Sequence, residues 1–286
     1  MTDGPFWPLY PVNYRHHFHA GNVADVFKHL VLTQVLEALR LKETPFCVID
    51  THAGSGRYRL KAPGEFEQGI GRLWPARANW PGLSSYFGLL ASLNEKALTV
   101  YPGSPWLVHA LLRPQDRAVF FENHPEEAEA LRTTLRGGRG ITINEVDAWA
   151  ALEGMLPPQE NRGLVFIDPP YEQPDEFNQV ARALKAAVLR WRNGIYMAWY
   201  PIKARRPVEQ LRERTRVLGT QALAIEFLTL PEDVPQRLNG SGVLLINPPW
   251  KLEETLRTVL PPLAEFLAGA HGAPQVRFLD LSGTKT

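Results

Sequence analysis

An acid and two prolines follow a short apolar run near the middle of the chain. Residues 163–172 read GLVFIDPPYE, so a buried strand is predicted to end on Asp168. Consecutive prolines stiffen the backbone and remove two N–H donors. Asp168 and the carbonyl group of Pro169 can then both accept hydrogen bonds from one exocyclic amino group, while Tyr171 offers a ring face to the base. The pattern predicts a corner that orients the amino group of a nucleobase.

The chemistry that suits such a corner is positioning catalysis. An amino nitrogen held between two acceptors keeps its lone pair in line with an electrophilic methyl group. Asp168 would also favour the positive charge that develops on the amine. The alternative is a turn whose prolines have no catalytic role.

A second Pro-Pro-aromatic sequence, NPPW, occupies residues 247–250. It follows a strand that we expect to run antiparallel to the others, so its end should lie at the opposite edge of the sheet. For this reason we assign the site to Asp168 and not to Asn247.

A glycine-containing loop follows the first predicted strand, in the sequence DTHAGSGRY at residues 50–58. Gly54 and Gly56 permit a tight turn and a close approach of the backbone to a ligand. A dinucleotide fingerprint would need a third glycine where Arg59 stands. The loop therefore disfavours NAD and favours a ligand without a pyrophosphate.

Two further acids end predicted strands. Glu122 can accept both hydroxyl groups of a ribose, as acids at comparable strand ends do; the alternative is an ordinary surface acid. Asp147 can accept from the amino group of a bound adenine, or it can cap the helix predicted for residues 147–155. We leave both alternatives open for each residue.

The N-terminal sequence NYRHHFHAGNVADVFKH, residues 13–29, holds four of the eight histidines. His16, His17 and His19 are too close together for one tetrahedral metal site. The chain also has no cysteine pair that could complete such a site. We therefore predict no metal. Tyr14 and the histidines are expected to line a polar cleft, with Lys28 or His29 reaching a ligand carboxylate.

The elements that must position these residues alternate between strand and helix. Strands are predicted at residues 46–50, 117–122, 140–146, 163–168 and 194–200, and helices at 22–41, 147–155 and 175–191. The segments 222–230 and 241–247 have no helix between them and predict an antiparallel pair. This order predicts an α/β fold with a mostly parallel sheet, whose ligands bind at the carboxyl ends of the strands.

Residues 58–103 interrupt this order with a stretch far longer than a normal connection. We predict a small, mainly helical insertion there. The remaining parts, residues 1–57 and 104–286, then form one methyltransferase-like domain.

Bulk composition excludes several classes. The chain has 286 residues, 44% hydrophobic and 21% charged, with a net charge of +1. The single cysteine, Cys47, rules out an internal disulfide. No segment approaches the ~20 apolar residues of a membrane helix, and the first residues do not read as a secretory signal. We predict a cytoplasmic monomer. The basic segment 203–216 is either a contact for nucleic acid or a solvated helix face.

Taken together, YRHHFHAGNVADVFKH, DTHAGSGRY and DPPYE resemble the bacterial 23S ribosomal RNA adenine-N6 methyltransferase J family over nearly the whole chain. The resemblance implies a Rossmann-like class I fold, S-adenosylmethionine as cofactor and one adenine of 23S ribosomal RNA as substrate. It implies that Asp168 is the catalytic acid and that Tyr14 contacts the substrate. It also implies cofactor contacts by His29, His52, Ser104, Glu122, Asp147 and Ala148.

Two other functions remain open from the residues alone. A DNA adenine methyltransferase needs the same base pocket, although the insertion is small for a DNA-recognition domain. A non-catalytic nucleic-acid-binding protein could keep the same scaffold, although Asp168, Gly54 and Gly56 argue against it.

Overall fold

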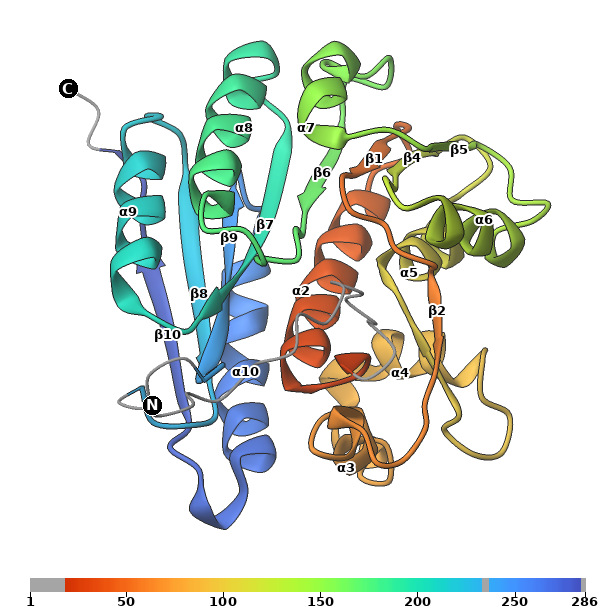
Figure 1. Ribbon diagram of the computed structural model, residues 1–286, viewed down its shortest axis with the longest axis vertical. Coiled ribbons are helices and arrows are strands. Elements are labelled where there is room, and N and C mark those ends of the chain that lie inside the picture. The colour runs from red at the N-terminus through yellow and green to blue at the C-terminus, as the bar shows by residue number, and fades with distance from the viewer. Residues whose placement is uncertain (1–18, 233–236, 284–286) are drawn as a thin grey trace, which may run out of the picture.

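The computed structural model describes residues 19–232 and 237–283, and its centre is an eight-stranded sheet (Figure 1). The strands lie in the order β10-β8-β9-β7-β6-β1-β4-β5. Their bounds are β1 (Cys47–Asp50), β4 (Arg117–Phe121), β5 (Ile141–Asn144), β6 (Gly163–Ile167), β7 (Ile195–Ile202), β8 (Ala222–Leu228), β9 (Gly240–Ile246) and β10 (Gln275–Asp280). The neighbours from β7 to β5 are all parallel, which confirms the five parallel strands predicted.

The last three strands run differently. β9 is antiparallel to β7, and β8 is antiparallel to β9, as the sequence predicted for this pair. β10 adds an antiparallel edge strand beside β8. We predicted neither β10 nor the helix α10 (Leu252–Ala268). Pro261 and Pro262 lie inside that helix and weaken its local signal, since proline normally breaks a helix interior.

Helices cover both faces of the sheet, because successive strand residues point to opposite sides. Val48 joins the core under α2 (Val23–Arg40), α5 (Ser104–Leu111) and α10, whereas Ile49 joins the core under α8 (Glu176–Arg190) and α9 (Arg205–Arg216). α2, α5 and α10 lie on one face, and α8 and α9 on the other (Figure 1). The sheet is therefore packed between two hydrophobic cores, one on each face.

Two side chains hold the beginning of α2. Asn22 caps the helix by accepting from the backbone N–H of Asp25 at 2.8 Å. The Asp25 carboxylate reaches back past Asn22 and accepts from the N–H of Gly21 at 2.9 Å. The loop before α2 is thus tied to Asp25, a residue that also contacts the candidate site.

Residues between β2 (Arg57–Arg59) and β3 (Val100–Pro102), which pair antiparallel, correspond to the predicted insertion. They contain α3 (Ile70–Leu73), α4 (Ser84–Ala91) and three short 3-10 turns, where we predicted a single short helix. The turns lie at Glu65–Glu67, Arg77–Asn79 and Pro81–Leu83. The segment lies against α2 and α10, and Arg72 donates to the carbonyl groups of Phe266 and Leu267. Its treatment as a separate subdomain stays a prediction.

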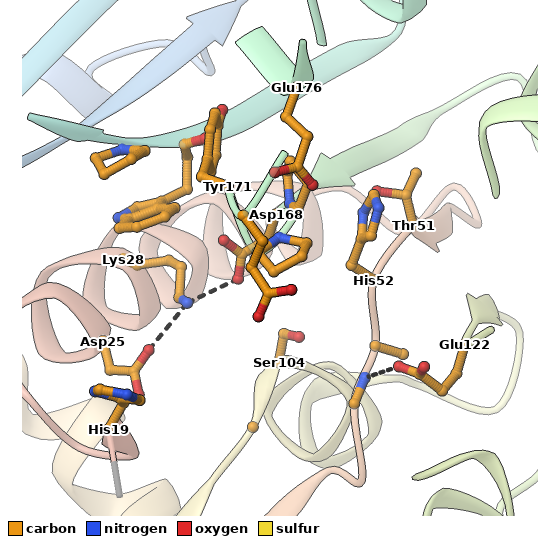
Figure 2. A pocket seen from close by; sticks show the side chains of 18 of the residues that line it. His19, Asp25, Lys28, Thr51, His52, Ser104, Glu122, Asp168, Tyr171 and Glu176 are labelled. Carbon is orange, nitrogen blue, oxygen red and sulfur yellow. Dashed lines mark hydrogen bonds and ion pairs between the residues drawn. The ribbon is translucent and has the colours of Figure 1, made fainter. Parts of the chain in front are cut away.

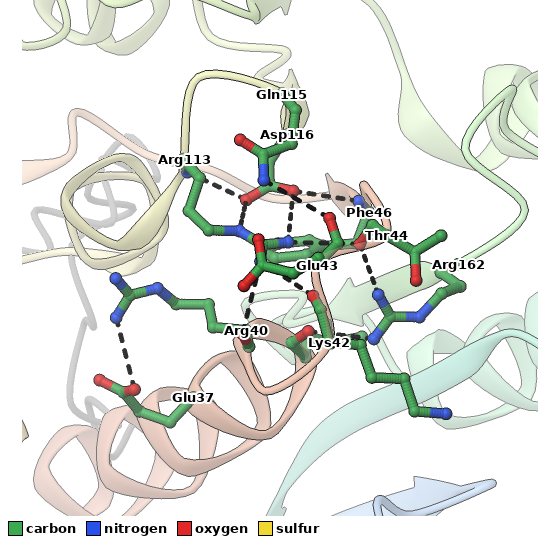
Figure 3. Close-up of polar contacts among 11 residues, drawn as sticks. Glu37, Arg40, Lys42, Glu43, Thr44, Phe46, Arg113, Gln115, Asp116 and Arg162 are labelled. Atoms are coloured by element: carbon green, nitrogen blue, oxygen red, sulfur yellow. Dashed lines mark hydrogen bonds and ion pairs between the residues drawn. The ribbon is translucent and has the colours of Figure 1, made fainter.

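A polar cluster holds the turn that leads from α2 into β1, at the amino end of the strand (Figure 3). Asp116 accepts from the N–H of Phe46 at 3.1 Å and from the guanidinium of Arg113 at 2.8 Å. Arg113 also donates to the carbonyl of Lys42, and Arg162 donates to that of Thr44. These bonds satisfy backbone groups that the turn would otherwise leave unpaired.

Candidate active site

One cavity of about 670 Å³ extends along the carboxyl ends of the parallel strands. Residues at the tips of five strands line it: Lys203 after β7, Asp168 after β6, His52 and Gly54 after β1, Glu122 after β4, and Asp147 after β5. Figure 2 shows Asp168, Tyr171, His52, Ser104 and Glu122 around this space. The sheet therefore brings together Glu122, Asp147 and Asp168, which are 21 to 46 residues apart in the sequence.

Asp168 is held by a buried ion-pair network (Figure 2). The Lys28 ammonium lies 2.7 Å from Asp168 Oδ2 and 2.9 Å from Asp25 Oδ1. Burial by itself would lower the pKa of Lys28, but the charges of Asp168 and Asp25 and the hydrogen bonds to both outweigh it and raise the pKa above its ordinary value. Lys28, predicted to reach a cofactor carboxylate, is thus bound to two acids of the chain.

The corner after Asp168 is rigid on its outer side. Tyr171 has a positive φ of 54°, donates its hydroxyl to the carbonyl of Trp199 at 2.7 Å and packs against Phe177 with ring centroids 4.7 Å apart. Burial raises the pKa of Tyr171 well above its ordinary value. Pro169 is buried and Pro170 is exposed. Tyr171 lines the cavity as predicted, and its stacking role stays a prediction.

The glycine loop and Glu122 are joined directly. Gly54 has a φ of 62°, and its N–H donates to Glu122 Oε2 at 2.7 Å. A Cβ atom on Gly54 would lie 2.2 Å from the hydroxyl oxygen of Tyr58, so no side chain fits there without displacing Tyr58. Glu122 Oε1 accepts from the N–H of His124 at 2.8 Å. Each carboxylate oxygen retains a lone pair for a ligand hydroxyl.

An aromatic pair lies beyond the glycine loop. The His52 ring is 4.9 Å from that of Trp149, and its Nδ1 lies 2.8 Å from the Thr51 hydroxyl oxygen. Burial lowers the pKa of His52 to about 4, so its imidazole is neutral at neutral pH. The pair offers ring surface rather than charge.

Asp147 acts as the helix cap that we had left as one of two alternatives. Its Oδ1 accepts from the N–H of Trp149 at 2.9 Å and begins α7 (Ala148–Ala151). The predicted helix 147–155 continues only as a 3-10 turn at Leu152–Met155. Asp147 and Ala148 both line the cavity, so the role of each toward an adenine stays a prediction.

Asp50 is a residue that we did not predict. It is completely buried at the end of β1, accepts from the Ser104 hydroxyl at 2.7 Å and from the N–H of His52 at 3.2 Å. Burial raises the pKa of Asp50 to about 7, against the opposing hydrogen bonds from Ser104 and His52. Asp50 holds two cavity residues in place, and an acid directly at a strand end was the signal that could have revealed it.

The histidine-rich segment is only partly described. Tyr14, His16 and His17 lie outside the described residues. His19 is 3.0 Å from Glu65, and His29 Nδ1 lies 3.0 Å from the hydroxyl oxygen of Tyr101. His29 is thus engaged within the cavity wall. Within residues 19–232 and 237–283, no group of three or more His, Cys, Asp or Glu could hold a metal ion.

The second Pro-Pro-aromatic sequence lies where its strand direction predicted. Asn247 follows β9, which is antiparallel to β7, and does not line the cavity. Its side-chain amide donates to the carbonyl groups of Arg192 and Gly194, both at 2.8 Å. This confirms the choice of Asp168 over Asn247 as the cavity residue.

Five parallel strands, an antiparallel pair beyond β7 and a cavity across the carboxyl ends define a Rossmann-like methyltransferase of class I. In the described part of the chain, no helix combines the length and the apolar character that a membrane span requires.

Comparison with known proteins identifies the family. A family model described as "Ribosomal RNA large subunit methyltransferase D, RlmJ" matches residues 43–279. The ribosomal RNA large subunit methyltransferase J of Haemophilus influenzae is 39% identical over 264 residues, which cover 90% of this chain and 94% of that protein. The Escherichia coli protein of the same name is 37% identical and covers 91% and 95%.

A solved structure agrees with the sequence relatives. Protein LPL1258 of Legionella pneumophila superposes with a TM-score of 0.87 at 33% identity, covering 93% of this chain and 99% of the other. The chain therefore belongs to the RlmJ family of ribosomal RNA large subunit methyltransferases.

Proposed function

We propose that this protein transfers a methyl group from S-adenosylmethionine to the N6 amino group of one adenine in 23S ribosomal RNA. The observation that carries the proposal is the position of Asp168. It lies in one continuous cavity with Gly54 and Glu122, so a cofactor and a base can meet at its carboxylate. We also propose that the protein acts in the cytoplasm as a monomer.

The residues in the cavity suit S-adenosylmethionine. A volume of about 670 Å³ is within the range of small-molecule sites. Glu122 has free lone pairs for the ribose hydroxyls, and the rings of His52 and Trp149 flank the side where Asp147 and Ala148 would meet the adenine. Ser104 lies at the beginning of α5, and its hydroxyl group donates a hydrogen bond to Asp50. The cofactor would supply an electrophilic methyl group on a sulfonium.

Asp168 would hold the substrate amino group by accepting a hydrogen bond from one of its N–H groups. Lys28 donates to Oδ2, so the carboxylate keeps a fixed orientation in the cavity wall. The carbonyl oxygen of Pro169 would accept a hydrogen bond from the second N–H, because the prolines of this corner offer no competing N–H. The nearby carboxylate of Asp168 would stabilise the positive charge that forms on the amine.

The test is methyl transfer with purified protein and radiolabelled S-adenosylmethionine. Ribosomal RNA from cells that lack this gene should accept the label, with N6-methyladenine at a single position. RNA from cells that carry the gene should not accept it. Transfer to duplex DNA and not to RNA would replace the proposal with the DNA enzyme, and no transfer to either would favour a binding protein.

A further inference from the structure

The order of the strands divides the cavity into two halves. Neighbouring strands of a sheet lie about 4.8 Å apart, so each strand tip occupies its own position along the cavity. The cofactor residues proposed above follow β1, β4 and β5. Asp168 follows β6, and Trp199, Pro201 and Lys203 line the wall on the β7 side. A base that reaches Asp168 from the side away from the cofactor must therefore pass over the end of β7.

Two lysines line the cavity, and they differ in every respect that matters for binding. Lys28 is buried and held by two carboxylates. Lys203 is exposed, and no hydrogen bond or ion pair engages its ammonium within the part of the chain that the structure describes. An unpaired, solvated ammonium at the mouth of a cavity attracts anions.

Three arginines of the basic segment 203–216 are held in ion pairs. Arg205 pairs with Glu226 at 2.6 Å and also with Glu232, and Arg212 pairs with the buried Glu226 at 2.9 Å. Farther along α9, Arg214 donates to Asn178, and Arg216 pairs with Glu213. Arg206 is exposed and, like Lys203, has no such partner among the described residues. The two interpretations of this segment, a contact for nucleic acid or a solvated helix face, must therefore be weighed for each residue separately.

The two cations of this segment that have no partner among the described residues are close in the chain. Lys203 follows β7 directly, and Arg206 lies in the first turn of α9, three residues later. Both are therefore at the cavity end of the helix. Glu232 is paired with Arg205 and with Arg277.

We propose that Lys203, assisted by Arg206, binds the phosphodiester backbone of the substrate RNA next to the adenine that enters the cavity. The inference rests on the proposed function. An enzyme that acts on a base must take it out of its stack, and the phosphates beside the extruded nucleotide then follow the base to the cavity mouth. Lysine suits this contact because its ammonium is a point charge that binds phosphate without reading sequence.

The test compares single variants in methyl transfer to ribosomal RNA over a series of KCl concentrations. For Lys203→Ala we expect kcat/KM to fall roughly five- to tenfold at low salt, and the slope of log kcat/KM against log salt to decrease by about one. Arg206→Ala should act in the same direction with a smaller effect. Lys203→Glu should lower kcat/KM further, and Lys203→Arg should keep most of it.

Arg214→Ala is the matched control, because it removes one charge from the far end of the same helix. It should keep the wild-type salt slope. The dissociation constant for S-adenosylmethionine should be unchanged in every variant, which excludes a general loss of structure.

The outcomes separate the two proposals. If the wild type methylates RNA and Lys203→Ala keeps the wild-type slope, the phosphate contact is rejected and the proposed function stands. If Arg214→Ala reduces the slope as much as Lys203→Ala, the effect is one of net charge and the contact is rejected as well. If the wild type does not methylate RNA, both proposals are rejected.

Discussion

Two corners of this molecule share a local sequence and differ in everything around it. DPPY at residues 168–171 and NPPW at 247–250 each follow an apolar strand, and each contains a residue with φ near 50°. The first corner lines the cavity, where Lys28 holds Asp168. At the second, Asn247 closes a turn on the backbone of residues 192 and 194, and Trp250 is 86% exposed.

The difference teaches that the direction of the preceding strand decides what such a corner can do. β6 is parallel to β1, so its end meets the glycine loop, whereas β9 is antiparallel to β7 and ends at the other edge. A polar side chain after the strand is therefore not enough to form a site. The ends of the neighbouring strands must also bring other polar residues to the same place.

The largest expected effect comes from removing the acid of the first corner. Asp168→Ala should lower methyl transfer by about 10³-fold or more, since both the orientation of the amino group and its charge stabilisation are lost. Single-turnover transfer at saturating cofactor and RNA measures this loss. Asn247→Ala is the matched variant at the other corner and should transfer methyl at the wild-type rate. Near-normal turnover of Asp168→Ala would remove the catalytic distinction between the corners.

Glu122 tests whether the partner strands matter as proposed. Glu122→Gln should raise the dissociation constant for S-adenosylmethionine about 10–100-fold, because a carboxylate that accepts two ribose hydroxyls loses one acceptor and its charge. Calorimetric titration measures the constant, and Glu126→Gln, an exposed acid of the adjoining helix α6 (Pro125–Thr134) that does not line the cavity, serves as a control. An unchanged constant for Glu122→Gln would be evidence against the ribose role.

Asp50, at the edge of the cavity, should make the stability of the protein depend on pH. The ordinary pKa of 3.8 is raised to about 7 in the folded protein. Between these values the folded state keeps a proton that the unfolded chain has lost, so the contribution of Asp50 to stability is full below about pH 4 and is lost as pH rises through 7. Asp50→Asn lacks this loss.

The free energy of unfolding of the wild type should therefore fall relative to Asp50→Asn between pH 4 and 7. The fall should be a few kcal/mol, since each pKa unit corresponds to about 1.4 kcal/mol. Urea denaturation at several pH values measures it. A constant difference between the two proteins over this range would show that Asp50 does not bind the proton.

The smallest expected effect belongs to the structural corner. Asn247→Ala should lower the free energy of unfolding by about 1–3 kcal/mol, because it removes two hydrogen bonds and because alanine tolerates the left-handed conformation at φ 52° less well than asparagine does. Asn247→Gly should recover the backbone part of this loss, which thermal denaturation can measure. Equal losses in both variants would mean that the backbone strain is negligible.

The sequence predicted much of the fold because its signals were local. Helical spacing in residues 22–41 and apolar runs such as 163–168 depend only on near neighbours, and both elements were confirmed. β10 was missed because an edge strand with half-buried residues has a weak pattern, and α10 because Pro261 and Pro262 interrupt its helical signal.

The candidate site was predicted in part for the same reason. Acids at strand ends, such as Asp168, Glu122 and Asp147, can be found from the strand pattern alone. Asp50 also ends a strand and could have been found in the same way, but its role in orienting Ser104 depends on a residue that is distant in the sequence. The division of the basic segment into paired and unpaired cations required Glu226 and Glu232, which lie on other elements.

The sequence by itself determined the order of strands and helices, the stiff corner after residue 167 and the family to which the chain is similar, because each depends on residues close in the chain. Only the tertiary structure decided that Lys28 bridges Asp25 and Asp168, that Arg205 is paired and that Lys203 has no ion-pair partner within residues 19–232 and 237–283. Pairing between charges depends on distance in space, and folding sets that distance by packing elements that the sequence keeps far apart.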